Sequence, residues 1–170
     1  MDGCGFYRDC PSISSPNRSF RIAVLGGSWN DPPTLVHWES ESLQPFRERA
    51  LELTQPLIEE NRLWGWKDPR NTLLLPFYRK LFPDMRVVVC VRNPLEVALS
   101  LLKRFTYAVD VAVEFQDGLR LCQNYYEALQ QQYDPDTWLV THYDSYFYDG
   151  STELSRLLDW IGLPYSEDDL

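Results

Sequence analysis

The chain has little positive charge and little histidine. Its 16 lysines and arginines stand against 25 aspartates and glutamates, which gives a net charge of −9. Such an acidic chain lacks the basic surface that binds nucleic acid or anionic membranes, so we expect neither partner. Only two histidines and four cysteines are present, and Cys4 and Cys10 lack partners at metal-ligand spacing. We therefore expect no metal site.

Long apolar runs are also missing. No stretch approaches the roughly 20 residues that cross a bilayer, and the N-terminus has no apolar segment typical of a signal peptide. We therefore expect a soluble protein in the reducing cytoplasm. Residues 1–21 are rich in glycine, serine and proline and have no periodicity, so we expect an atypical, poorly ordered leader before one domain at 22–170.

A short unit of a basic residue, an acid or amide and a proline occurs twice. It reads Lys-Asp-Pro at 67–69 and Arg-Asn-Pro at 92–94. Each unit follows a strand-like run and precedes a helical pattern. Asp68 and Asn93 are good N-caps, and proline is favoured at the first helical position. Because helix N-termini present free N–H groups and the positive end of a dipole, the two units predict a site for a phosphorylated or sulfated ligand.

Strand and helix patterns alternate along the chain, which predicts an α/β fold with three layers and a mainly parallel sheet. The clearest strand, 86–92, is continuously apolar, as in a strand covered on both faces, and we expect its Cys90 to be buried. We expect strands at 63–67, 86–92 and 138–142, and helices at 43–61 (kinked or broken at Pro56), 69–82, 94–104, 111–133 and 152–161, the last ended by Gly162.

The ends of these strands carry the candidate binding residues. Ligands of open parallel sheets bind at the carboxyl ends of the strands, where Lys67, Arg92 and His142 fall. If Asn93 caps the helix, Ser100 lies seven residues later, two turns along on the same face. Arg92 and Ser100 can then grip one phosphate from two sides, because arginine supplies a planar fork and serine a neutral donor.

Three segments resemble sulfotransferases, enzymes that use 3′-phosphoadenosine 5′-phosphosulfate (PAPS). Arg-Asn-Pro-Leu-Glu-Val-Ala-Leu-Ser at 92–100 resembles their 3′-phosphate-binding motif. Gly-Trp-Lys-Asp-Pro-Arg at 65–70, with Leu-Leu-Pro-Phe at 74–77, resembles bacterial members of the family. Val-Thr-His-Tyr-Asp-Ser at 140–145 is similar to the family's strand ending in a Tyr-Glu-Asp-like triplet. The resemblance covers roughly residues 22–166.

The resemblance implies a fold of the P-loop nucleoside triphosphate hydrolase type and transfer of a sulfuryl group from PAPS to a hydroxyl or amine. Arg92 and Ser100 would hold the 3′-phosphate of the nucleotide, and Tyr143 would lie near the adenine. No metal is needed, because cations and backbone N–H groups stabilise the developing charge. The resemblance leaves the acceptor open, and we expect a small molecule or a carbohydrate.

Three further residues are candidates with a competing structural explanation. Lys67 is the best cation for the charge on the leaving 5′-phosphate, or else a strand-end lysine in solvent or paired with Asp84. Arg70 is a ligand-binding candidate, or else caps local carbonyls or pairs with Asp68. His37, in a proline-rich loop, is a candidate base, although a lone loop histidine is more often inert. The aromatic residues at 146–148 could stack on the adenine or pack under the last helix, and we expect them to pack.

One part of the family pattern is missing. Sulfotransferases carry, after their first strand, a loop such as Arg-Ser-Gly-Thr-Ser that cradles the 5′-phosphosulfate, whereas Arg-Ser at 18–19 has no glycine and no strand before it. We therefore expect an N-terminally truncated domain, either a fragment of a full enzyme or a short protein. The alternative to catalysis is a nucleotide-binding or protein-interaction module, because loss of a strand exposes a sheet edge through which copies can associate.

Overall fold

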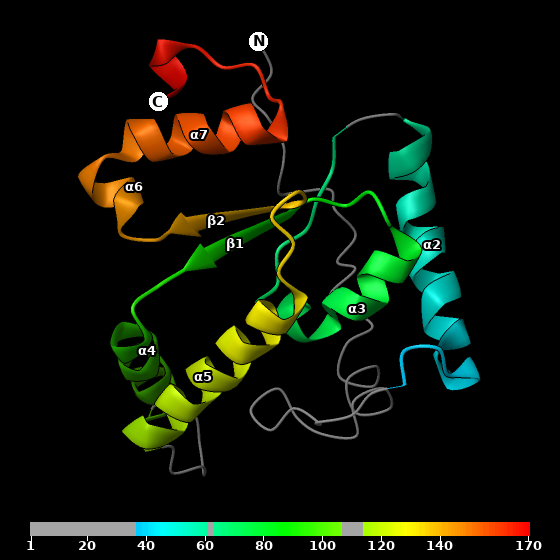
Figure 1. Ribbon diagram of the computed structural model, residues 1–170, viewed down its shortest axis with the longest axis horizontal. Helices are drawn as coiled ribbons and strands as arrows, with labels where there is room; N and C mark the ends of the chain where they lie inside the picture. The colour runs from blue at the N-terminus through cyan, green and yellow to red at the C-terminus, as the bar shows by residue number, and fades with distance from the viewer. Residues whose placement is uncertain (1–36, 61–62, 107–113) are drawn as a thin grey trace. The chain divides into compact units, whose positions relative to one another are not determined.

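The structure, a computed structural model, describes residues 37–60, 63–106 and 114–170, and of residues 104–106 only the backbone. The chain divides after Pro83 into two compact units, each of which is described by itself (Figure 1). The expected leader at 1–21 and the apolar run at 22–25 lie outside the described residues. None of the helices in the described ranges is long and apolar enough to cross a membrane.

The first unit contains a 3₁₀ turn, η1 (Glu41–Leu43), and the helices α2 (Gln44–Glu59) and α3 (Asn71–Leu81). The expected interruption at Pro56 is not found, since α2 continues through it. Apolar residues at helical spacing turn one side of each helix inward. The buried residues of this unit are Leu43, Ala50, Thr54, Leu74, Leu75, Phe77 and Tyr78.

The strand predicted at 63–67 is absent, and that prediction is wrong. Its two tryptophans pack on each other and on α3. The rings of Trp64 and Trp66 stack with their centroids 5.6 Å apart, and the ring of Trp66 meets that of Tyr78 edge-on at 5.0 Å. Alternation of large apolar side chains favours an extended chain, but a strand also needs a hydrogen-bonded neighbour. The first unit offers no such neighbouring strand among its described residues, and the tryptophan side chains pack on aromatic rings.

The second unit has α/β architecture around a small parallel sheet. Strand β1 (Val87–Val91) pairs in parallel with β2 (Trp138–His142), with Val89 opposite Val140. Both strands agree with the predicted ranges. The expected burial of β1 on both faces is wrong, however, because Val88 is 42% exposed and Cys90 is exposed as well. The three-layer arrangement and the P-loop type of fold stay predictions.

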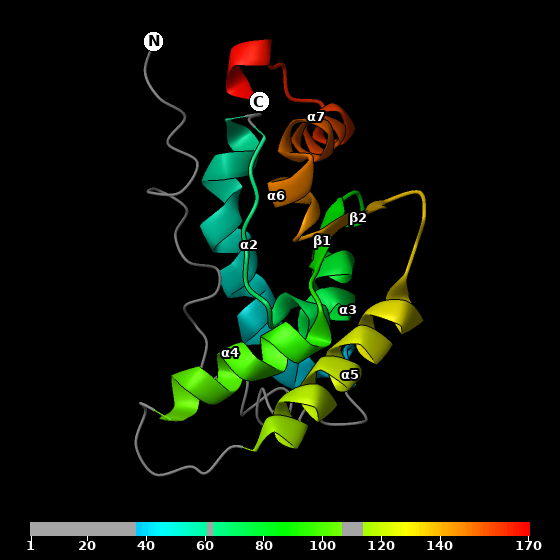
Figure 2. The ribbon, with the colours of Figure 1, turned by 90° about the vertical axis from the view of Figure 1, so that its left-hand side faces the viewer.

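Two helices pack together beside the sheet. Helices α4 (Pro94–Thr106) and α5 (Phe115–Gln132) lie side by side in both views (Figures 1 and 2). Their contact needs a glycine, because a Cβ added to the buried Gly118 would lie 2.8 Å from the Cα of Ala98. This close approach brings the side chains of α5 against the turn that joins β1 to α4.

The last helices follow β2 directly. The short α6 (Ser145–Tyr148) was not predicted, while α7 (Gly150–Ile161) agrees with the predicted closing helix and ends at Gly162 in the left-handed conformation (φ 84°). The aromatic residues at 147–148 in α6 are 70% and 89% exposed, so the expectation that they pack under the last helix is wrong. A final 3₁₀ turn, η2, spans Glu167–Asp169, and helix α7 packs on β2. The unit therefore places α6 at the carboxyl end of β2.

The outer edge of β2 is closed by α7. Arg156 donates to the carbonyl of Val140 at 2.8 Å, and the N–H of His142 donates to the carboxylate of Glu153 at 3.3 Å. The hydrogen bond from Arg156 lowers the pKa of Glu153 and so keeps this carboxylate charged. These contacts satisfy backbone groups that a further strand would otherwise bind.

The outer edge of β1 is closed at one end only. The N–H of Val87 donates to Thr137 and the carbonyl of Val91 accepts from Tyr143, so residues 87, 89 and 91 face β2 and the residues between them face outward. The backbone groups of Val88 and Cys90 have no hydrogen-bond partner in the described part of the chain. Among the described residues, the outer edge of β1 is therefore unpaired over these two residues.

Candidate functional site

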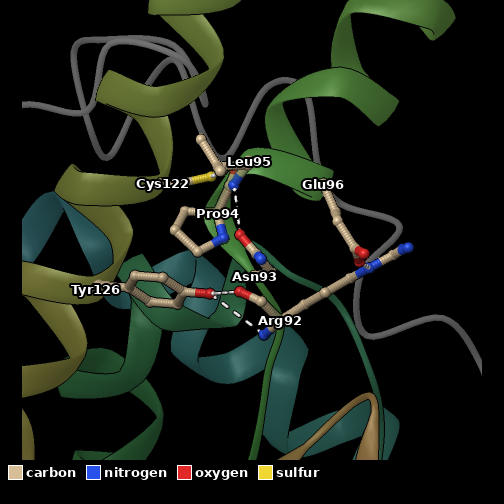
Figure 3. A network of polar contacts seen from close by, with 7 residues as sticks. All are labelled: Arg92, Asn93, Pro94, Leu95, Glu96, Cys122 and Tyr126. Atoms are coloured by element: carbon tan, nitrogen blue, oxygen red, sulfur yellow. Dashed lines mark hydrogen bonds and ion pairs between the residues drawn. The ribbon is translucent and has the colours of Figure 1, made fainter. Parts of the chain in front are cut away.

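The site begins at the turn between β1 and α4 (Figure 3). The side chain of Asn93 accepts a hydrogen bond from the N–H of Leu95 at 3.0 Å, and Pro94 is the first residue of α4. This confirms the predicted cap and the predicted place of the proline. The turn also fixes the direction in which the chain leaves the strand, and with it the position of Arg92.

The first N–H groups of α4 are already bonded. Pro94 has none, that of Leu95 goes to the Asn93 side chain, and those of Glu96 and Val97 go to the Asn93 carbonyl at 3.0 and 3.1 Å. The expectation that this helix end presents free N–H groups is therefore wrong. A ligand here has to be held by side chains, with the helix dipole as a weaker contribution.

The backbone of Arg92 is held from α5. The hydroxyl of Tyr126 donates to the Arg92 carbonyl at 2.6 Å and accepts from its N–H at 3.3 Å. Figure 3 shows the Tyr126 ring on one side of the chain and the Arg92 side chain leaving on the other. One side chain thus closes the end of the β1 edge and anchors the residue that carries the cation.

The guanidinium of Arg92 is oriented by two neighbours. Its Nε donates to the carboxylate of Glu96 at 2.9 Å, and the group lies over the ring of Tyr143, 4.4 Å from the centroid. The hydrogen bond to Glu96 raises the pKa of Arg92, so the cation persists at any working pH. The terminal nitrogens Nη1 and Nη2 have no hydrogen-bond partner among the described residues, which leaves a two-pronged donor for a ligand.

Tyr143 is brought to Arg92 by the sheet. Its N–H donates to the carbonyl of Val91 at 2.8 Å, which continues the pairing of the two strands by one residue. Arg92 and Tyr143 follow two strands that are far apart along the chain, and the family motifs predicted that both belong to one nucleotide site. In the structure their side chains are in contact. The parallel register is what aligns them.

Ser100 lies on α4 and is exposed. It follows Glu96 by four residues, so the two side chains share a helix face. Because Glu96 contacts Arg92, that face is turned toward the guanidinium. Ser100 therefore lies one turn beyond Glu96 along the same side of the helix, and its role as a second phosphate donor stays a prediction.

The remaining candidates belong to the first unit. Arg70 forms an ion pair with Asp68, which is one of the competing explanations given above. Lys67 is exposed and makes no hydrogen bond or ion pair with the described residues, and it does not end a strand. His37 is exposed too, and its carbonyl accepts from the N–H of Ser40 at 3.0 Å.

Two residues of the site were missed by the sequence reasoning. Glu96 carried a usable signal, because it follows Arg92 by four residues at the start of a predicted helix, where ion pairs form. Tyr126 carried none, because its hydrogen bonds join residues 34 positions apart and depend on how α5 packs against α4. No group of three or more acidic, histidine or cysteine side chains in the described ranges is arranged to bind a metal.

A comparison with models of known protein families identifies the family of this chain. A model of the sulfotransferase family matches residues 27–167. The chain belongs to the sulfotransferase family. The match confirms the resemblance carried by the motifs at 65–70, 92–100 and 140–145, and it covers every candidate side chain named above. No curated protein and no solved structure matches this family member.

Proposed function

We propose that this sulfotransferase-family chain binds PAPS, with the Arg92 turn at its 3′-phosphate, and transfers the sulfuryl group to a hydroxyl or amine of a small-molecule or carbohydrate acceptor. One observation carries the proposal: Arg92 is held at its backbone, its Nε and its planar face, while both Nη nitrogens are unbonded in the described part of the chain. An arginine held in this way loses little entropy on binding a phosphate.

The residues fit the 3′-phosphate end of PAPS. The Nη pair of Arg92 supplies a bidentate contact, and Ser100 supplies a neutral donor from the same face of α4. Glu96 neutralises part of the arginine charge and also points its own charge at the site. We therefore expect moderate affinity, with the phosphate competing against the ion pair for the guanidinium.

The transfer step needs further groups, which we assign from the sequence alone. An acceptor oxygen or nitrogen attacks sulfur, the bond from sulfur to the 5′-phosphate oxygen breaks, and the acceptor proton goes to a base. Lys67 is proposed to stabilise the charge on the leaving phosphate, and His37 is proposed as the base. Arg70 is a weaker candidate for ligand binding, because Asp68 holds it.

Calorimetric titration with adenosine 3′,5′-bisphosphate tests this proposal. Wild type should bind, and Arg92→Ala should lose at least tenfold in affinity, since a charge-assisted contact contributes about 1.5–3 kcal/mol. Arg120→Ala is the matched control, because Arg120 lies in the same unit and, among the described residues, makes only an exposed ion pair with Asp117. Equal losses in the two variants, or no binding by folded wild type, would refute the assignment.

The open edge of β1 favours a second function, that of an interaction module. The outward N–H and carbonyl groups of Val88 and Cys90 suit pairing with β1 of a second copy, so we propose that the chain self-associates there. Sedimentation of Val88→Lys should give monomer, because an edge lysine opposes pairing. Val140→Lys, on the strand edge that α7 closes, should leave the association intact. A monomeric wild type would refute this function.

A further inference from the structure

The two outer edges of the sheet are treated differently. The edge of β1 is unpaired at Val88 and Cys90 among the described residues, whereas α7 lies beside β2 and covers its edge (Figure 1). A sheet with two unpaired edges can add strands on both sides, and a sheet with one can add them on one side only. The way in which α7 covers β2 therefore decides how far this sheet can be extended.

The register shows which backbone groups of β2 are available to a further strand. Residues 137 and 143 bond to β1, so by alternation residues 138, 140 and 142 direct their backbone groups away from it. Side chains of α7 bind two of these outward groups, the carbonyl of Val140 and the N–H of His142. The edge is thus covered through single side-chain contacts, which a strand of a second copy can replace.

The two side chains that make these contacts also hold each other. Arg156 donates to both carboxylate oxygens of Glu153, from Nε at 3.1 Å and from Nη2 at 2.7 Å. The same Nη2 donates to Val140, and the same oxygen, Oε1, accepts from both Nη2 and His142. We call Glu153 and Arg156 the α7 clamp. Because its contacts share atoms, removal of one side chain frees one backbone group and loosens the hold on the other.

The clamp lies at the surface, where a competing strand can reach it. The Arg156 side chain is 43% exposed, and an ion pair in such a position contributes little to stability. Val140, between the two clamped groups, is itself 36% exposed. With the clamp closed, pairing at the β1 edge is isologous and ends at two copies. With the clamp open, each copy has two free edges, and copies can add without limit.

We propose that the α7 clamp masks a second interface along β2 for another copy of this chain, and thereby stops association at β1 after two copies. This inference rests on the proposed self-association at β1 and deepens it, since it names what sets the number of copies. The occupant is a copy of this chain because β2 belongs to the same sheet as the β1 edge, and its released groups again suit strand pairing.

Sedimentation velocity at several protein concentrations tests the clamp. We expect wild type to sediment as a dimer, and Arg156→Ala to form species larger than a dimer that grow with concentration. Arg120→Ala is the matched control, because it also removes an arginine from an i, i+3 ion pair, here with Asp117 on α5. This control should sediment as wild type does. Identical sedimentation of wild type and Arg156→Ala would overturn the inference.

Two further variants distinguish edge pairing from aggregation of a misfolded chain. Val88→Lys combined with Arg156→Ala closes the β1 edge and leaves only β2 free, so the large species should become a dimer. Glu153→Gln keeps an oxygen that accepts from His142 and Arg156, so it should sediment as wild type does. Unlimited growth of the double variant would overturn the inference. A monomeric wild type with a dimeric Arg156→Ala would overturn association at β1 and still support the masked interface.

Discussion

The turns that open α3 and α4 share a basic residue, an acid or amide and a proline, yet their cations differ. In the α3 turn (67–72), Asp68 accepts from the Nε of Arg70 at 2.5 Å and from its backbone N–H at 2.9 Å, while Lys67 contacts none of the described residues. In the α4 turn (92–97), Arg92 is held by Tyr126, Glu96 and Tyr143.

The two turns bond their backbone groups alike, but their helices begin at different places. Helix α4 begins at Pro94, whereas α3 begins at Asn71 with Arg70 before it as the N-cap, so the predicted cap at Asp68 and the predicted helical start at Pro69 are wrong. In each turn, the first three N–H groups after the proline bond to the turn itself.

The two cations differ in their contacts because the α4 turn directly follows the paired strand β1. This places Arg92 next to Tyr126 of α5 and next to Tyr143, which follows β2. The α3 turn follows a segment that has no strand pairing among the described residues and whose tryptophans pack on neighbouring rings. Neighbouring elements, more than the local motif, therefore decide which cation is prepared for a ligand.

The largest expected effect removes the support of the α4 turn. Gly118→Ala places a Cβ 2.8 Å from the backbone of Ala98, so we expect a loss of about 1–3 kcal/mol in the free energy of unfolding, although alanine favours helices. Chemical denaturation measures this loss. Gly150→Ala, whose Cβ would meet nothing within 4 Å, should be neutral or stabilising. Equal stability of the two variants would show that the close contact of α4 and α5 is unimportant.

Helix α3 carries a buried tyrosine whose ionisation should lower the stability of the protein at high pH. Burial, aided by the negative charge of Asp68, raises the pKa of Tyr78 to about 12. The unfolded chain loses this proton near its ordinary pKa of 10.0, so stability is present below pH 10 and falls as pH rises toward 12, by about 2 kcal/mol. Thermal melting of wild type and Tyr78→Phe measures the fall, which should be smaller in the variant. Parallel curves would contradict the shift.

Tyr126→Phe tests how much the anchoring of the Arg92 backbone contributes to ligand binding, because it leaves the charge of Arg92 unchanged. The variant loses both hydrogen bonds to the Arg92 backbone, so we expect about 1–2 kcal/mol less stability and a few-fold weaker binding of adenosine 3′-monophosphate. Denaturation and calorimetry measure the two effects. Tyr133→Phe, at a half-exposed residue whose ring packs on Trp138, serves as the control. Unchanged affinity in Tyr126→Phe would mean that backbone anchoring does not prepare the site.

The smallest expected effect concerns Glu96. Glu96→Gln keeps a hydrogen-bond acceptor for the Nε of Arg92 and removes a negative charge beside the proposed phosphate. We expect about two- to threefold tighter binding of adenosine 3′-monophosphate at low salt, with the gain fading as salt rises. Weaker binding would mean that the charge of Glu96 is needed to orient the guanidinium.

Local patterns predicted the elements whose causes are local. The apolar run at 86–92 and the Asn-Pro pair after it carry their own strand and cap signals, and β1, Asn93 and Pro94 confirm them. The prediction of a strand at 63–67 was wrong, because alternation of apolar side chains is a property of one segment, whereas a strand also needs a second segment to pair with. Of the break or kink predicted at Pro56, the break is not found, because α2 runs without interruption from Gln44 to Glu59.

Contacts between distant residues account for what sequence reasoning missed. The pairing of Tyr126 with Arg92 depends on a glycine contact between two helices. The exposure of Phe147 depends on which side of α6 meets the sheet, and a four-residue helix is too short to show a periodic pattern. Arg92, Ser100 and Tyr143 were predicted from the family motif, which already contains the outcome of such packing.

The most direct test compares Arg92→Ala with Lys67→Ala in titrations with adenosine 3′-monophosphate, which has no 5′ group. The account predicts a loss of at least tenfold for Arg92→Ala and a change within twofold for Lys67→Ala, because Arg92 alone of the two cations is held in place by neighbouring side chains. Similar losses for the two variants, or a larger loss for Lys67→Ala, would contradict the claim that neighbouring elements select the cation that binds the 3′-phosphate.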